Sequence, residues 1–392
     1  MSPTRRVLLL TGAAVFLAAF DGSTLFLALP AIAHEFHARV SDLSNVGSIL
    51  GLGSLAALPL AALADRAGRR RVLAAAVAGF CLANLATFFA TGLVFLALAR
   101  LVASCFEVVA ITVAGVLVVE EVAAERRAFA IAGLTVAGGG GGGLTTILYP
   151  LLAPNWRLLY LLGSVGIVAA PVIWKWLPES RLFLPPQGGG RPGAGRGFLL
   201  LWDRPWRRRL IVLSLFSLLS AIAFTPGGLL GAVYASQDLR MSPTQISAVL
   251  LVTGTVASAG YLAGGWISDR TGRRAPAVGL SLLAAAMSII TYLGTVLAFW
   301  AGNLGYLVVA SAVAPIVVTW FAELFPTRAR ATSQAVATVL GALGGIAGLQ
   351  LVGALSGRIG LGPALVGVGL APLAGALVLG FLPETRGEPL PD

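Results

Sequence analysis

Charged residues are scarce in this sequence, and their scarcity limits the class of protein. Asp, Glu, Lys and Arg make up 11% of the 392 residues, against about 25% in ordinary soluble domains. Hydrophobic types reach 57%, and the mean hydropathy is +0.90. A water-soluble fold and a disordered chain are both excluded, because neither keeps this much apolar surface in water. We therefore expect a protein with many membrane spans.

Cysteine and histidine are almost absent, with two residues of each. Cys81 and Cys105 both lie in apolar stretches, which leaves no disulfide framework and no CxxC metal motif. His34 and His37 are predicted to lie near one surface and form no nucleophile-and-base constellation. The sequence therefore predicts no metal, no cofactor and no enzymatic activity.

Apolar stretches long enough to cross a bilayer occur twelve times. A span needs about 20 apolar residues. The first stretch continues beyond the length of a signal peptide, which favours a membrane span over a cleaved leader. The predicted spans are 7–33, 41–63, 71–91, 93–119, 127–152, 157–177, 208–232, 243–267, 275–295, 297–322, 330–355 and 361–382. The sequence therefore predicts an all-α membrane protein.

Basic residues outnumber acidic ones by 27 to 16, which gives a net charge of +11. In a soluble protein such an excess would suggest a nucleic-acid partner. Here 22 of the 27 fall on one side when alternate loops are assigned to the same side, and membrane proteins keep Lys and Arg in cytoplasmic loops. We predict that both termini are cytoplasmic, that the chain lies in the plasma (inner) membrane, and that it binds no nucleic acid.

Three short motifs recur in the second part of the chain at offsets of 203 to 205 residues. They are DRAGRR at 65–70 and DRTGRR at 269–274, Glu120 with Arg127 and Glu323 with Arg330, and PES at 178–180 and PET at 383–385. Together they indicate duplication of a six-span unit. We predict an N-terminal half over residues 1–177, a cytoplasmic linker over 178–207 and a C-terminal half over 208–392.

At these motifs the sequence resembles the major facilitator superfamily over all twelve predicted spans. The DRxGRR turns match its signature loop, and AELFPTRARAT at 322–332 resembles the branch of sugar porters and related metabolite symporters. The seventh span lacks the paired glutamines typical of sugar porters, which argues against a sugar substrate. The resemblance implies two parallel six-helix halves that rock about a central site to give alternating access. We expect a monomer that binds a small-molecule substrate and a proton.

Acids and bases of the repeated motifs are candidates for a cytoplasmic latch. They are Asp65, Arg69, Glu120 and Arg127 in the first half and Asp269, Arg273, Glu323 and Arg330 in the second. Pairs such as Asp65 with Arg69 and Glu120 with Arg127 could bridge neighbouring helices when the cytoplasmic side is closed. The alternative is positive-inside anchoring with incidental ion pairs of little energy. We favour the latch because the acids recur at fixed offsets from the arginines.

Three charged residues are predicted to lie deep within spans: Asp21, Arg100 and Glu107. Each costs about 2.5–3.5 kcal/mol at the bilayer centre, so such residues are functional candidates. Asp21 and Arg100 lie at a similar depth, and Glu107 lies two turns from Arg100 on the same helix face. The family resemblance implies that Asp21 and Arg100 act in proton coupling, whereas Glu107 has no such support. The alternative is a static ion pair that fixes helix packing.

Polar and aromatic side chains in the spans are candidates for substrate contact, with packing or interfacial anchoring as the alternative. They are Asn84, Tyr149, Tyr261, Asn303, Tyr306, Trp320 and Gln334. Six glycines at 138–143 favour close helix packing. The predicted function is proton-coupled transport of a small organic metabolite, with import favoured over export. The alternative is a drug/proton antiporter of the same superfamily, although the proline-containing fifth-span motif of such antiporters is missing.

Overall fold

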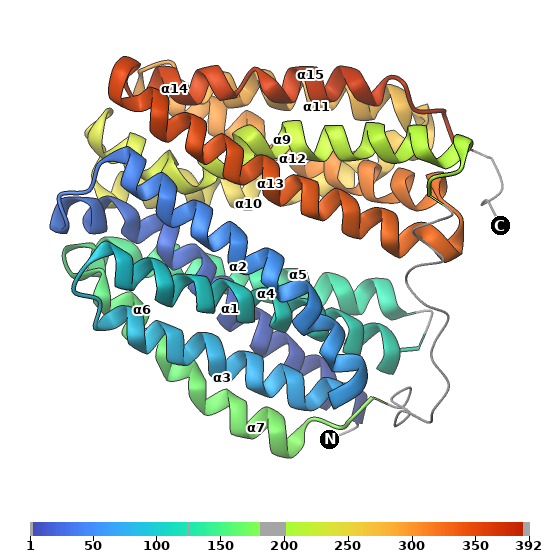
Figure 1. Ribbon diagram of the computed structural model, residues 1–392, viewed down its shortest axis with the longest axis horizontal. Coiled ribbons are helices and arrows are strands. Elements are labelled where there is room, and N and C mark those ends of the chain that lie inside the picture. Colours follow the sequence, from blue (N-terminus) through green and yellow to red (C-terminus); the bar gives the residue numbers. More distant parts are fainter. Residues whose placement is uncertain (1–2, 124–125, 181–200, 387–392) are drawn as a thin grey trace. The chain divides into compact units, whose positions relative to one another are not determined.

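The computed structural model describes residues 3–123, 126–180 and 201–386 (Figure 1). It contains twelve helical segments that are long and apolar enough to cross a membrane, and every predicted span overlaps one of them. The chain divides into two compact units, Met1–Gly189 and Gly190–Asp392. The predicted linker falls largely on residues 181–200, which lie outside the described residues, so the bounds 178–207 stay a prediction.

The described residues of the first unit hold six spans in seven α-helices. These are α1 (Pro3–Glu35), α2 (Val40–Ala67), α3 (Arg69–Phe88), α4 (Leu93–Glu121), α5 (Arg127–Leu152), α6 (Arg157–Val165) and α7 (Ala169–Trp176). The sixth span consists of α6 and α7 joined by a 3-10 turn over Gly166–Val168. Because bilayer hydrocarbon offers no hydrogen-bond partners, helical backbone within each span satisfies its own N–H and carbonyl groups.

The second unit repeats this arrangement. Its helices are α9 (Arg204–Gln237), α10 (Pro243–Thr271), α11 (Arg274–Thr291), α12 (Val296–Leu324), α13 (Thr327–Ile359), α14 (Leu361–Val368) and α15 (Ala371–Leu379). The twelfth span consists of α14 and α15, as the sixth consists of α6 and α7. The pairs α1 with α5 and α9 with α13 pack closely in their own units.

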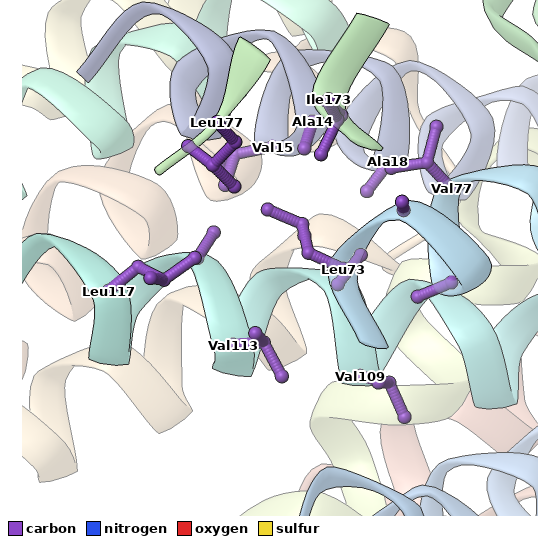
Figure 2. Close-up of a cluster of buried hydrophobic side chains, with 14 of the residues drawn as sticks. Ala14, Val15, Ala18, Leu73, Val77, Val109, Val113, Leu117, Ile173 and Leu177 are labelled. Atoms are coloured by element: carbon purple, nitrogen blue, oxygen red, sulfur yellow. The ribbon is translucent and has the colours of Figure 1, made fainter. Parts of the chain in front are cut away.

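Small and branched apolar side chains fill the interior of the first unit (Figure 2). Ala14 and Ala18 on α1 face Leu73 and Val77 on α3, and Val113 on α4 lies in the same cluster. All five are at most 2% exposed. Since lipid is as apolar as this core, close packing rather than exclusion of water holds the helices together.

Glycines allow the closest helix contacts. A Cβ atom on Gly141 of α5 would lie 2.1 Å from the carbonyl oxygen of Phe16 on α1. A Cβ atom on Gly344 of α13 would lie 2.2 Å from the carbonyl oxygen of Leu218 on α9. The glycine run at 138–143 therefore serves helix packing in the first unit, and its equivalent does so in the second.

Candidate functional site

A buried ionic cluster lies inside the first unit, and its centre is Arg100 of α4. The Nη1 atom donates to Oδ1 of Asp21 on α1 at 2.9 Å and to Oδ1 of Asn84 on α3 at 2.8 Å. The Nη2 atom donates to Oε1 of Glu107, two turns along α4, at 2.9 Å. The ring of Tyr160 on α6 lies with its centroid 5.2 Å from the guanidinium carbon. The structure thus brings together all three charged residues predicted to lie deep in the membrane.

The two carboxylates of this cluster differ in accessibility. The side chains of Arg100 and Asp21 are 1% and 0% exposed, whereas that of Glu107 is 13% exposed. Oδ2 of Asp21 accepts no hydrogen bond from a donor group among the described residues. The carboxyl group of Glu107 is a neighbour of Asp21. One guanidinium therefore faces two carboxyl groups in a site with little access to water.

Sequence reasoning missed Tyr160, which is fully buried against Arg100. An aromatic ring face attracts a cation more strongly in a desolvated site. A tyrosine within a span has no sequence signal that separates this role from packing. Asn84, in contrast, was predicted as a substrate contact, and the structure places it on Arg100 with 0% of its surface exposed.

A second cluster joins three segments at the end of the first unit where the repeated motifs lie. Arg69 at the start of α3 pairs with Glu120 in the last turn of α4 at 2.9 Å. The hydroxyl of Ser180 donates to the other oxygen of Glu120 at 2.6 Å. The backbone N–H groups of Arg69 and Arg70 donate to Oε1 of Glu179 at 2.8 and 3.2 Å. The carboxylate of Glu179 therefore caps the N-terminus of α3, where the helix dipole favours negative charge.

The second unit contains the same cluster built from the repeated residues. Arg273 pairs with Asp269 at 2.9 Å and with Glu323 at 3.3 Å. The hydroxyl of Thr385 donates to Glu323, as that of Ser180 does to Glu120 in the first unit. The backbone N–H of Arg273 donates to Glu384 at 2.8 Å. Duplicated sequence motifs thus make duplicated contacts.

Backbone geometry and electrostatics support the cluster of the second unit. Gly272 connects α10 to α11 with a φ of 99°, a left-handed conformation that glycine adopts without strain. Partial burial raises the pKa of Glu384, but hydrogen bonds from the backbone N–H groups of Arg273, Arg274, Arg386 and Thr385 outweigh it and hold the pKa below its usual value. This carboxylate is therefore stabilised in its ionised form.

Two of the expected latch pairings are replaced by other contacts. Glu120 pairs with Arg69 and not with Arg127, whose Nε donates to the carbonyl of Val122 at 3.2 Å. Arg330 likewise donates to the carbonyl of Phe325 at 3.5 Å. These arginines bind the carbonyl groups that the preceding helix leaves free at its end. The side chain of Asp65 lies outside the described residues.

Sequence reasoning also omitted the carboxylates and hydroxyls of the third motif from the latch. They are Glu179, Ser180, Glu384 and Thr385, and all four contact the repeated acids or arginines. The recurrence of PES and PET was a signal that could have included them, since it matched the offset of the other motifs.

Other predicted substrate contacts are dispersed through the fold. Tyr149 and Trp320 are 2% and 0% exposed, and Nε1 of Trp320 donates to the carbonyl of Pro383 at 3.1 Å. Asn303 accepts a hydrogen bond from Thr253 at 3.2 Å. Tyr306 is half-buried on α12, and Tyr261 is 48% exposed on α10. The contacts of Trp320 and Asn303 serve helix packing in this structure.

Gln334 lines a groove in the second unit with a volume of about 360 Å³. Residues of α9, α12 and α13 form its walls: Ser217, Ser220, Ala221, Phe224, Phe321, Gln334, Ala337, Thr338 and Gly341. None of these lining residues is charged. The groove therefore offers aromatic surface, hydroxyl groups and an amide to a ligand.

A comparison with protein families identifies the fold. The model of the Major Facilitator Superfamily matches residues 11–349 and 216–391. The chain belongs to the Major Facilitator Superfamily. It resembles a solved structure, a bacterial homolog to the human lysosomal transporter Spinster, with a TM-score of 0.78 at 19% identity, over 97% of this chain and 95% of that one. The predicted all-helical fold with twelve spans is confirmed.

Two curated transporters are similar along nearly their whole length. The 3-(3-hydroxy-phenyl)propionate transporter of Escherichia coli (strain K12) is 27% identical over 408 residues, covering 97% of this chain and 94% of the relative. The putative niacin/nicotinamide transporter NiaP of Bacillus subtilis (strain 168) is 25% identical over 370 residues, covering 90% and 89%. The chain is therefore an integral membrane transporter of small organic metabolites and not an enzyme.

Proposed function

We propose that this superfamily member imports a small aromatic acid together with a proton across the plasma membrane. The observation that carries the proposal is the position of Arg100 between two carboxyl groups inside the first unit. One guanidinium balances the charge of one carboxylate. A second uncompensated negative charge in this buried site is costly, so the cluster reaches neutrality by taking up one proton.

The proton is held by the carboxyl pair formed by Asp21 and Glu107. Oδ2 of Asp21 has no donor partner among the described residues, and a shared proton gives it one. The side chain of Glu107 is the more exposed of the two, which makes it the entry point for the proton. Release requires the contacts of Arg100 to change during the transport cycle.

The groove of the second unit supports an aromatic substrate. Phe224 and Phe321 offer ring surface, and Ser217, Ser220 and Gln334 offer hydrogen bonds to a ring hydroxyl or ring nitrogen. The two similar transporters are named after aromatic acids of this kind, a hydroxyphenyl propionate and niacin. We assign the aromatic end of the substrate to this groove.

We also propose that the two motif clusters act as a cytoplasmic latch. In this structure each cluster is closed within its own unit, through Arg69 and Glu120 in the first and Arg273 and Glu323 in the second. They hold the ends of three segments together, so that each unit moves as one body when the transporter alternates between states. Removing one of these pairs loosens its unit and so changes the relative stability of the inward- and outward-facing states.

Proteoliposomes test the function directly. Vesicles loaded with buffer are given radiolabelled 3-(3-hydroxyphenyl)propionate, nicotinate or a control sugar, with or without an inward proton gradient. We expect accumulation of an aromatic acid that collapses when a protonophore is added. Equal uptake with and without the gradient contradicts proton coupling, and gradient-driven loss of preloaded substrate would favour the efflux antiporter.

A further inference from the structure

A basic pocket of about 630 Å³ lies in the second unit and shares no lining residue with the groove around Gln334. Arg208 and Arg209 in the first turns of α9 line it together with Arg274, the first residue of α11, and the segment Gly380–Pro383 after α15. Helix α15 packs against both α9 and α11 (Figure 1). The pocket therefore lies where the seventh and ninth spans begin and the twelfth ends.

One arginine of this pocket is held by other residues, and the other two have side chains without a partner among the described residues. Arg209 donates to the carbonyl of Leu324 at 2.8 Å, and its guanidinium carbon lies 4.9 Å from the ring centroid of Trp206. The side chains of Arg208 and Arg274 are exposed and form no hydrogen bond or ion pair with any residue that the structure describes. Two guanidinium groups are thus free to bind an anion.

Nearby acids do not neutralise the pocket. No acidic residue lines it among those that the structure describes. Glu384, next to the lining residue Pro383, accepts the backbone N–H groups of Arg273 and Arg274 at 2.8 and 2.9 Å. Its carboxylate is therefore engaged with the N-terminus of α11 and not with the guanidinium groups of the pocket.

The pocket also has an apolar side at the level of the span ends. Phe381 lines it and is 63% exposed, and Leu377, one turn earlier on α15, is 60% exposed. A soluble anion makes no favourable contact with this apolar surface, whereas the acyl chain of a lipid packs against it while the phosphate lies among the arginines. Basic pockets between span ends bind the phosphate groups of anionic lipids.

We propose that this pocket binds the phosphate headgroup of an anionic phospholipid, with Arg208 and Arg274 on the phosphate and Phe381 against the start of an acyl chain. Arg209 also lines the pocket and adds positive charge. The pocket is at the end of the unit that carries the repeated motifs, which the distribution of basic residues assigns to the cytoplasmic leaflet.

Native mass spectrometry of the purified, delipidated transporter tests this site without any transport measurement. The protein is titrated with phosphatidylglycerol and, separately, with phosphatidylcholine. We expect tighter binding of phosphatidylglycerol, and about fivefold weaker binding for each arginine removed, hence about 25-fold in R208Q/R274Q. Binding of phosphatidylcholine should be unchanged in that variant.

Matched variants keep the test specific. R358Q removes an exposed arginine from the last turn of α13 and should leave phosphatidylglycerol binding unchanged. R208K/R274K preserves the charges and should retain most of the binding. Equal weakening by R358Q, or unchanged affinity in R208Q/R274Q, would overturn the proposal. Displacement of the lipid by millimolar inorganic phosphate alone would assign the pocket to a soluble phosphate and overturn the lipid headgroup.

Discussion

The two units of this transporter preserve the same motif clusters but differ in their buried charges. Gly141 lies close to Phe16 in the first unit, and Gly344 lies close to Leu218 in the second. These matching approaches align α1 with α9 at an offset of 202 residues. At that offset Ala223 is the residue equivalent to Asp21. Glu120 and Glu323 align α4 with α12 at an offset of 203 residues, so that Asn303 is the residue equivalent to Arg100. The motif clusters are thus part of the structure that both units share. The buried charges instead distinguish the first unit, which indicates a function of that unit.

This difference assigns separate tasks to the two units. The first has the ionic cluster that we propose to bind a proton, and the second has an uncharged groove with aromatic and hydroxyl groups. A buried ion pair is a weak source of stability, because desolvation offsets most of the attraction. Among the described residues it is present in one unit only, which argues for a functional role rather than a requirement of the fold.

Removing the carboxylate of Asp21 should have the largest effect. An aromatic acid anion carried with one proton moves no net charge, so the membrane potential does not drive its uptake and its accumulation follows the pH difference, about tenfold or 1.4 kcal/mol per pH unit. We expect Asp21→Asn to abolish accumulation against a gradient and to retain counterflow, because exchange does not require the proton to leave. Proteoliposome uptake measures both. Glu107→Gln is the comparison: if it abolishes accumulation while Asp21→Asn does not, the proton belongs to Glu107 alone.

Placing the acid in the other unit should expose the cost of burial. Ala223 is 6% exposed on α9. We expect Ala223→Asp to destabilise the protein by about 2.5–3.5 kcal/mol, the cost of a charged residue near the bilayer centre. Adding Asn303→Arg should recover part of this loss by supplying a partner. Thermal unfolding in detergent measures the change, and an unaltered melting temperature in Ala223→Asp would show that this position is hydrated.

Truncating the groove should weaken substrate binding and leave coupling intact. Phe224 is 63% exposed in the groove wall, and an aromatic pair contributes about 0.5–1.5 kcal/mol. We expect Phe224→Ala to raise the KM for an aromatic acid up to about tenfold without changing its pH dependence. Phe89→Ala is the control, because Phe89 is 64% exposed at the end of α3 and lies outside the groove. A change in pH dependence in Phe224→Ala would contradict the separation of tasks.

The spans and the three membrane-buried charges could be predicted from sequence because each follows from a local cost. Hydrocarbon requires continuous apolar helices, and a charge in a span stands out against them. The ion pairs of the motif clusters could not be predicted, since which acid meets which arginine depends on which helices pack together. Glu120 illustrates this: spacing along the chain indicated Arg127, but the packing of α3 on α4 brings Arg69 to it.

The smallest expected effect concerns the shared clusters, where the two units should behave alike. Glu384 has a folded-state pKa below its usual value, so its contribution to stability is present above the unfolded-state pKa and is lost as pH falls through the folded-state pKa. Because this side chain is exposed, we expect Glu384→Gln to cost at most about 1 kcal/mol at pH 7 and nothing in strong acid. Glu179→Gln should cost a similar amount, since its carboxylate accepts the equivalent backbone N–H groups at the start of α3. Thermal unfolding at pH 7 measures both, and repeating it down to pH 3 tests the pH dependence expected for Glu384. Equal loss at all pH values would assign the effect to packing, and a large loss in one unit only would show that the duplicated contacts have diverged in energy despite their shared geometry.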